Sequence, residues 1–304
     1  MTMLDTIRAA VAIGPAMRRT RTDIDTLIEE ILADPPDPRR QLHEAMRYAA
    51  IGGGKRLRPL LVIASAGIFG VPRTWSLRAG LAVECVHVHS LIHDDLPCMD
   101  DDDLRRGKPT VHRAYDEATA VLAGDALLAL AFEILADPAT HPLSDVRANL
   151  VLELAKAVGV AGMAGGQMLD LLPHNEGVDL AAVTRLQRLK TGALISWCLE
   201  AGAIMGKAPP DMHTRLRGYA HCLGLAFQIA DDLLDCEGEQ AKVGKRVGKD
   251  SAQGKQTFVS ILGPERARTQ SQLLVAQALD HLRGFGEEAD LLRAIAQFAV
   301  KRDH

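Results

Sequence analysis

Residues 121–136 read VLAGDALLALAFEILA, and this stretch indicates the fold class. Apolar side chains recur in it at spacings of three and four, which is the period of an α-helix. Residues 181–205, AAVTRLQRLKTGALISWCLEAGAIM, repeat the pattern. Both helices are apolar on more than one face, so each should be surrounded by other helices. We therefore predict an all-α protein built as a large helical bundle.

The composition of the whole chain fits one domain. The sequence has 304 residues, of which 47% are hydrophobic and 24% are charged, as in globular proteins with a sizeable core. No linker or low-complexity segment divides it, so we predict a single domain over residues 1–304. No convincing alternating strand or hairpin turn is visible. The net charge of -4 and the scattered basic residues favour neither a nucleic-acid partner nor a cationic membrane surface.

The cysteines and the N-terminus indicate the compartment. The five cysteines are far apart, odd in number and form no C-x-x-C pair, which argues against a disulfide framework and a structural zinc site. The N-terminus lacks the order of a secretion signal, and no apolar run approaches the roughly 18 to 20 residues that span a bilayer. We predict a cytoplasmic protein with no stable membrane insertion.

Residues 94–103 read DDLPCMDDDD and follow an apolar stretch. Two unit charges about 4 Å apart repel by about 1 kcal/mol in water, so this cluster opposes folding unless something positive compensates it. A bound divalent metal is one explanation, and an acidic, solvated helix end is the alternative. Pro97 disfavours helical geometry at Leu96, which lets the chain loop Asp100 back towards Asp94.

A second acidic cluster ends another apolar helix. Residues 222–236 read CLGLAFQIADDLLDC. At about 100° per residue, Asp231 and Asp235 lie about 40° apart around the helix axis, so both carboxylates share one face. Two such clusters, more than a hundred residues apart, favour a shared metal-binding cavity over two solvated helix ends.

Carboxylates with Mg²⁺ commonly hold a phosphorylated substrate, so cations should surround the same cavity. Residues 52–59, GGGKRLRP, set basic side chains beside glycines but do not form a Walker A loop, because Ala49 and Arg56 stand at two of its required positions. Any one basic residue is more typical of a solvated surface. The basic residues that recur beside glycines or acidic motifs are Lys55, Arg56, Arg58, Arg105, Arg106, Lys190, Lys245 and Lys255.

Three histidines precede the first acidic cluster and could suggest a zinc or metal-dependent phosphohydrolase site. His89 and His93 share a helix face, whereas His87 is turned away from it, so a ligand set of three histidines on one helix is awkward. His87 and Asp94 are seven residues apart and do align. We therefore assign His87 to the phosphate-binding cavity and leave the other two out of metal binding.

Taken together, these motifs resemble the trans-isoprenyl diphosphate synthases, most closely the bacterial farnesyl diphosphate synthase branch. The resemblance joins, in the family's order, GGGKRLRP, SLIHDDLPCMDDDDLRRGKPT, GGQMLDL, LKTGAL, AFQIADDLLD and GKQT. It implies a single all-α domain around a deep central cavity, and a homodimer. It also implies condensation of isopentenyl diphosphate with dimethylallyl and geranyl diphosphate, giving (2E,6E)-farnesyl diphosphate and pyrophosphate by metal-assisted ionisation.

The resemblance also assigns residue roles. The cofactor is Mg²⁺, with about three ions per site in this family and Mn²⁺ as an alternative. The implied metal ligands are Asp94, Asp95, Asp100, Asp231, Asp232 and Asp235. The implied contacts to the allylic diphosphate are Arg105, Lys190, Lys245 and Lys255. Thr191 and Gln228 match positions beside the reacting allylic carbon. The implied pocket for isopentenyl diphosphate comprises Lys55, Arg58, His87 and Arg106. Gln167 and Asp170 match a further motif as supporting residues.

Product length in this family depends on bulk at the fifth position before the first aspartate, which here is His89, followed by Ser90. Short-chain bacterial members often have an aromatic residue there. The bulk of histidine favours a fifteen-carbon product, and a twenty-carbon product, as from a geranylgeranyl diphosphate synthase, is the alternative. A terpene cyclase would typically carry an N-D-x-x-S-x-x-x-E motif where this chain has DDLLD. A non-catalytic partner subunit tends to lose one acidic cluster, and both are present.

Overall fold

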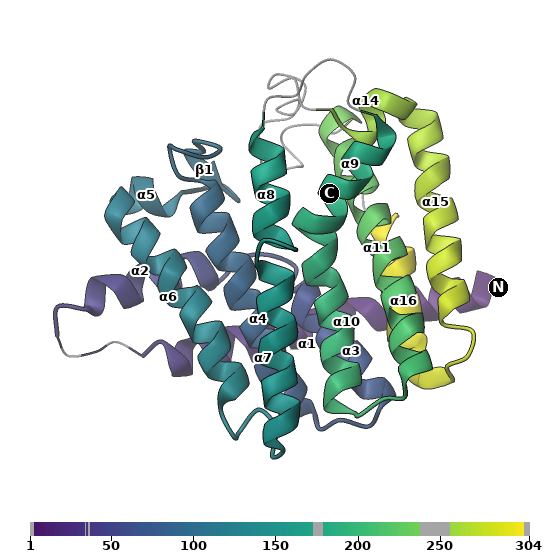
Figure 1. The fold of residues 1–304 in the computed structure, drawn as a ribbon, viewed down its shortest axis with the longest axis horizontal. Coiled ribbons are helices and arrows are strands. Elements are labelled where there is room, and N and C mark those ends of the chain that lie inside the picture. Colours follow the sequence, from purple (N-terminus) through teal and green to yellow (C-terminus); the bar gives the residue numbers. More distant parts are fainter. Residues whose placement is uncertain (1–2, 34, 36, 173–178, 238–255, 301–304) are drawn as a thin grey trace.

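The computed structural model describes the chain except for residues 1–2, 34, 36, 173–178, 238–255 and 301–304. Helices make up nearly all of its regular structure, so the all-α prediction is confirmed (Figure 1). The helices are α1 (Met3–Ile31), α2 (Arg40–Ala50), α3 (Leu57–Ile68), α4 (Arg73–Asp94), α5 (Val111–Ala114), α6 (Glu117–Ala136), α7 (Ser144–Val158), α8 (Met163–Leu171), α9 (Leu180–Gln187), the π-helical turn η1 (Arg188–Gly192), α10 (Ala193–Met205), α11 (Pro210–Glu237), α14 (Phe258–Leu262), α15 (Pro264–His281), the 3₁₀ turn η2 (Glu287–Ala289) and α16 (Asp290–Ala299).

The core lies between helices that are apolar on several faces, as the sequence indicates. α4 packs against α3 and α6, and α10 packs against α3 and α11. Leu61, Val86, Leu199 and Leu223 are fully buried in this core. Gly202 lets α10 approach α3 closely, because a Cβ atom added there would collide with the backbone of α3. The inner helices are therefore held as a rigid frame by close packing.

The two acidic clusters end up at the same end of the bundle. α4 finishes at Asp94, directly before the segment that carries β1, and α11 finishes at Glu237, near α14. Both ends point to the upper side of the molecule in Figure 1, where the tops of α8 and α9 also lie. The frame therefore presents the acidic helix ends on one side.

A short hairpin follows the first cluster. β1 (Leu104–Arg105) pairs antiparallel with β2 (Lys108–Pro109), and Arg106 and Gly107 form the turn with φ angles of 53° and 76°. Positive φ at both central residues is the geometry of a tight two-residue hairpin turn. The expectation that the chain has no hairpin turn was wrong. Strands of two residues are too short to leave an alternating pattern in the sequence.

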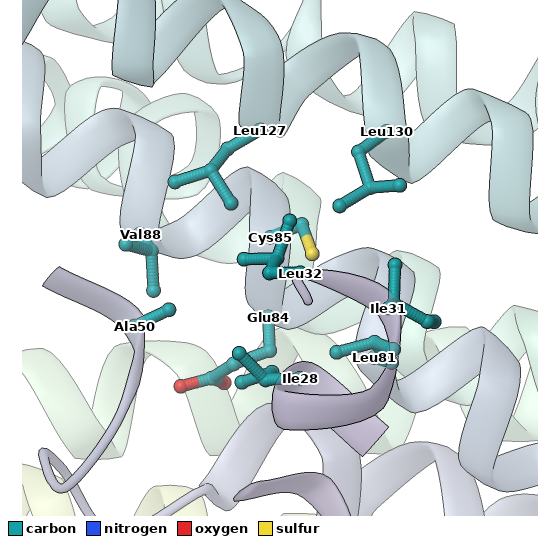
Figure 2. A pocket seen from close by; sticks show the side chains of 10 residues that line it. All are labelled: Ile28, Ile31, Leu32, Ala50, Leu81, Glu84, Cys85, Val88, Leu127 and Leu130. Carbon is teal, nitrogen blue, oxygen red and sulfur yellow. The ribbon is translucent and has the colours of Figure 1, made fainter. Parts of the chain in front are cut away.

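A small void lies among α1, α2, α4 and α6 (Figure 2). Its volume is about 10 Å³, so it has room for about one water molecule. Leu127 and Leu130 of α6 face Cys85 of α4 across it, and the lining is apolar apart from Glu84. A charged carboxylate in such surroundings needs a partner, which Arg56 provides.

Within the part of the chain that the structure describes, two segments are apolar enough, by length and composition, to cross a membrane: Glu117–Ala136, which is α6, and Ser144–Leu171. The expectation that no apolar run reaches that length was therefore wrong. An 18-residue window of α6 has a mean hydropathy of 1.8, although the helix contains Asp125 and Glu133. α6 packs along α4, and its buried residues include Ala123, Gly124 and Leu127. Core helices of soluble proteins have the same character.

Candidate active site

The loop after α4 folds back on the helix end. The backbone N–H of Asp100 donates to the carbonyl of Asp94 at 2.9 Å, and that of Asp102 donates to the carbonyl of Asp95 at 3.3 Å. Asp101 adopts a positive φ of 49°, which completes the reversal. The predicted return of Asp100 towards Asp94 is confirmed, because Pro97 cannot continue the helix.

This return creates electrostatic strain at Asp94. Burial raises the pKa of its carboxyl to about 6, and the neighbouring charge of Asp100 pushes the pKa in the same direction. The positive charges of Lys190 and Arg105 oppose that rise. Two clustered carboxylates, one of which resists ionisation, form a site whose charge a divalent cation would balance.

Asp95 has a different environment from Asp94. It is 3% exposed, and its carboxylate accepts two hydrogen bonds from Nε of Arg105, at 2.9 and 2.8 Å, and one from Nη2 at 2.5 Å. Such a bidentate pair has fixed geometry. Asp95 therefore fixes Arg105 directly beside the acidic loop.

In the second cluster, too, adjacent aspartates have different environments. α11 continues without a break through Asp231 and Asp235, so the two carboxylates share a face as predicted. Asp231 is exposed and Asp235 is partly exposed. Asp232, by contrast, is 5% exposed and accepts hydrogen bonds at 2.9 Å from the side-chain amide of Gln228 and from the backbone N–H of Phe258. Asp232 thus attaches the start of α14 to α11.

The turn η1 connects the two acidic ends. Nζ of Lys190 lies 2.6 Å from Oδ2 of Asp170, and its charge acts on Asp94 of the first cluster. The hydroxyl of the next residue, Thr191, donates to Oε1 of Gln228 at 3.4 Å, one turn before Asp232 of the second cluster. Gly166 of α8 makes this possible, because a Cβ atom there would collide with the backbone of Lys190.

A basic group lies beside the first cluster. The guanidinium of Arg106 rests on Gly53 and Gly54, where an added Cβ would come within 2.5 and 2.8 Å of its nitrogens. Burial and then the charge of Arg58 lower the pKa of His87 well below its usual value, and Arg106 adds to the effect. His87 is therefore neutral near pH 7. Nζ of Lys55 lies 5.7 Å from the centre of the Phe298 ring.

Among the described residues, the buried donors in this region without a hydrogen-bond acceptor include Nε of Arg56, Nε of Arg58 and Nε2 of Gln167. A buried donor without an acceptor costs about 1–3 kcal/mol. An anionic ligand in the site would supply acceptors for such groups. The residues present therefore fit an anion near carboxylates that could hold a cation.

The sequence did not indicate the supporting role of Arg56. Arg56 adopts a positive φ of 50°, and its fully buried guanidinium bonds to Glu84 at 2.6 Å, to Asp25 at 2.5 Å and to the carbonyl of Ala50. This network fixes the loop that carries Lys55 and the start of α3, which carries Arg58. The only signal in the sequence was one acidic residue, Glu84, within the apolar stretch LAVECVHV.

The residues predicted to set product length lie against α6. Nδ1 of His89 is 3.0 Å from the carbonyl oxygen of Gly124, and the hydroxyl of Ser90 turns back to the carbonyl of His87. Burial lowers the pKa of His89 to about 4, so this ring is neutral at pH 7. Lys245 and Lys255, the remaining candidates for diphosphate binding, lie outside the described residues.

Comparison with known proteins agrees with this geometry. The sequence model of the polyprenyl synthetase family matches residues 39–297. The chain belongs to this family. The farnesyl diphosphate synthase of Bacillus subtilis is 43% identical over 272 residues, covering 89% of this chain and 91% of the relative. The farnesyl diphosphate synthase of Escherichia coli is 44% identical over 281 residues, covering 91% and 94%.

Other members of the family are equally or more similar in sequence. Geranylgeranyl pyrophosphate synthase 11 of Arabidopsis thaliana is 44% identical over 268 residues, covering 86% of this chain and 74% of the relative. Among solved structures, an FPP/GFPP synthase from Zymomonas mobilis superposes with a TM-score of 0.88 at 56% identity, covering 96% of this chain and 99% of that one. The prediction of family and fold is confirmed.

Proposed function

We propose that this protein is a farnesyl diphosphate synthase, a Mg²⁺-dependent short-chain trans-prenyltransferase. It condenses isopentenyl diphosphate with dimethylallyl and then geranyl diphosphate, and releases pyrophosphate at each step. The observation that carries the proposal is the position of η1 between the two acidic helix ends: the charge of Lys190 acts on Asp94, and Thr191 bonds to Gln228, which bonds to Asp232. The similarity to farnesyl diphosphate synthases over most of the chain supports it.

Members of this family use divalent metal ions, and the oxygen-rich donor set favours Mg²⁺, with Mn²⁺ as an alternative. We assign Asp94, Asp100, Asp231 and Asp235 as the side chains that hold the ions, about three per site. Asp95 and Asp232 were implied as ligands too, but their hydrogen bonds favour positioning roles. The bound ions would offset the negative charge that grows on the departing pyrophosphate.

The allylic diphosphate lies, in this proposal, among Lys190, Arg105, Lys245 and Lys255. Breaking its C–O bond leaves a positively charged allylic carbon, and the pyrophosphate takes the bonding electrons. The side-chain oxygens of Thr191 and Gln228 lie 3.4 Å apart and can face that carbon with their negative ends. The apolar walls of the predicted central cavity exclude water, which would quench the cation.

Isopentenyl diphosphate binds, in this proposal, to Lys55, Arg58, His87 and Arg106. His87 is neutral, so it offers one N–H donor and no charge of its own. The double bond of this substrate attacks the allylic carbon, a new C–C bond forms, and a proton must then leave. We propose that the released pyrophosphate accepts this proton, as the resemblance to the family implies.

We propose further that residues 1–304 form a single domain, and that two chains associate as a cytoplasmic homodimer without stable membrane insertion or nucleic-acid binding. The apolar surface of α6 supports association, since Val121 is 40% and Leu122 is 56% exposed. Leu152 on the neighbouring α7 is 50% exposed. Exposed apolar side chains on adjacent helices are typical of subunit interfaces.

The product is proposed to have fifteen carbons, because His89 is held against α6 by its bond to Gly124 and should limit the cavity. His89→Ala should lengthen the product, and an unchanged product distribution would count against this role. Geranylgeranyl diphosphate, with twenty carbons, is the alternative product, and it is favoured by the similarity to geranylgeranyl pyrophosphate synthases.

The decisive experiment incubates the pure protein with Mg²⁺, isopentenyl diphosphate and each allylic starter in turn. Chromatography of the dephosphorylated products should show mainly farnesol. Mainly geranylgeraniol would move the assignment to the twenty-carbon synthases. Released hydrocarbons would identify a terpene cyclase, and no product would identify a non-catalytic subunit.

A further inference from the structure

A second group of metal-ligating side chains lies between α4 and α6. His89 and His93 come from α4, and Asp125 comes from α6. One ring nitrogen of each histidine and one carboxylate oxygen of Asp125 all lie within 4.8 Å of one another. Nε2 of His93 is 3.9 Å from Oδ1 of Asp125, and the two imidazole rings are in contact with their centres 4.5 Å apart.

The local backbone builds this group. His89 and His93 are four residues apart, so both rings leave the same face of α4. Gly124 lets α6 come close, because a Cβ atom there would collide with the ring of His93. The two helices therefore hold three potential ligands from two directions, which a solvated surface cluster would not do.

Both rings are oriented by main-chain carbonyls of α6. Nδ1 of His89 lies 3.0 Å from the oxygen of Gly124, and Nε2 of His93 lies 3.1 Å from the oxygen of Val121. A carbonyl only accepts, so these nitrogens carry the protons and the other nitrogen of each neutral ring keeps a lone pair. His89 is oriented as metal-binding histidines commonly are, by a carbonyl on the nitrogen opposite the ligand. Nε2 of His93, which lies 3.9 Å from Asp125, would have to give up its bond to Val121 to bind a metal.

The carbonyl of Val121 would lose little if His93 exchanged its bond for a metal, and the bond of His89 to Gly124 need not change. Val121 and Gly124 lie inside α6, so their oxygens also accept the helical N–H bonds from four residues further on. Asp125 is 62% exposed at its side chain and can turn towards the rings without unpacking the core. Small side-chain rotations are therefore enough to close the group around one ion.

We propose that His89, His93 and Asp125 form a binding site for a divalent transition metal, best suited to Zn²⁺. Two imidazole nitrogens and one carboxylate oxygen leave a fourth, open position in a tetrahedral site. Imidazole ligands select Zn²⁺, Co²⁺ or Ni²⁺ over Mg²⁺, which prefers oxygen. This site is distinct from the proposed Mg²⁺ ligands, and its existence does not depend on prenyl transfer. A bound ion ties α4 to α6 and stabilises the folded protein.

The test measures binding of Zn²⁺ to the untagged protein by competition with a chromophoric chelator, in the presence of saturating Mg²⁺. Cys98 and Cys236 are exposed and could also bind zinc, so both are replaced by serine in the background protein. We expect one equivalent of Zn²⁺ per chain and a higher Tm on its addition. Co²⁺ should give the intense visible absorption of a tetrahedral complex.

Two variants and one matched control locate the ion. His89→Ala and Asp125→Asn should each weaken Zn²⁺ binding at least about tenfold. His221→Ala, a change of an exposed histidine on α11, should leave it unchanged. Asp125→Asn changes only an exposed side chain, so it keeps the test valid if His89→Ala fails to fold. Unchanged affinity in Asp125→Asn, or displacement of Zn²⁺ by Mg²⁺, would overturn the proposal, whatever the prenyltransferase activity.

Discussion

The acidic ends of α4 and α11 have the same Asp-Asp pair but achieve their geometry differently. At α4, the helix stops and the chain folds back, so Asp100 returns to Asp94 through a backbone hydrogen bond. At α11, the helix continues, and Asp235 lies one turn beyond Asp231 on the same face. A broken helix and an intact helix thus both bring a third aspartate beside the first.

At both helix ends, one aspartate of the adjacent pair is more exposed than the other. Asp94 and Asp231 are the more open members, whereas Asp95 and Asp232 are almost fully buried. Arg105 binds the first buried carboxylate, and Gln228 with the backbone of Phe258 binds the second. The comparison teaches that adjacent identical residues on a helix end point in different directions and take different roles.

The largest expected effect is a loss of activity when the more exposed aspartates, Asp94 and Asp231, are replaced. Asp94→Asn and Asp231→Asn should each lower kcat by about 10²–10³, because each removes negative charge from the proposed metal site. Stability without metal should fall little, because Asp231 is exposed and burial disfavours the charged form of Asp94. Steady-state kinetics at saturating Mg²⁺ measure the effect. If either variant is as active as the unmodified protein, its acidic cluster does not take part in catalysis.

Replacing a buried aspartate should mainly lower the stability of the protein. Asp95→Ala leaves the guanidinium of Arg105 without its main partner and should lower the free energy of unfolding by about 3 kcal/mol. Asp103→Ala is the matched control, because Asp103 pairs with Arg113 on the surface, where such pairs contribute at most about 1 kcal/mol. Urea unfolding of both variants gives the comparison. An equal loss in the two variants would refute the distinction between buried and open aspartates.

The connection between the two ends can be broken at α8. Gly166→Ala places a methyl group against the backbone of Lys190, so η1 must move away from α8. We expect a drop in kcat of about tenfold and a loss of about 1–3 kcal/mol in the free energy of unfolding. Gly67→Ala in α3 meets no atom within 4 Å and serves as the control. Full activity of Gly166→Ala would mean that the position of Lys190 is not critical.

Stability should also depend on pH in metal-free buffer. The pKa of Asp94 is about 6 in the folded protein and about 3.8 in the unfolded chain, so the folded state binds more protons between these values. The contribution of this group to stability is therefore full below pH 4 and is lost as the pH rises through 6. Asp94→Asn should remove this loss, which amounts to at most about 3 kcal/mol.

Thermal unfolding of Asp94→Asn and the unmodified protein at pH 4 and pH 7, without metal, measures this difference. The variant should gain stability relative to the unmodified protein as the pH rises, and Mg²⁺ should reduce that gain. Parallel pH profiles for the two proteins would show that the carboxyl of Asp94 has an ordinary pKa.

Local chemistry explains which features were predictable. Pro97 can only end α4, and the spacing of Asp231 and Asp235 places them on one face of any helix. The hairpin at Arg106 was not predictable, because its strands contain two residues each. The partners of Arg56 were not predictable either, because Asp25 and Glu84 come from other helices. Spacing along α4 gave no third ligand for His89 and His93, since Asp125 belongs to α6.

The sequence by itself determined the helical bundle, the break after α4, the shared face of the second cluster and the family, because each depends on patterns within one short segment. Only the tertiary structure decided which aspartates stay open, which cations they meet and that α6 adds a ligand beside two histidines. These outcomes depend on how closely helices approach, and that distance is set by small residues such as Gly124 and Gly166 packing against distant segments.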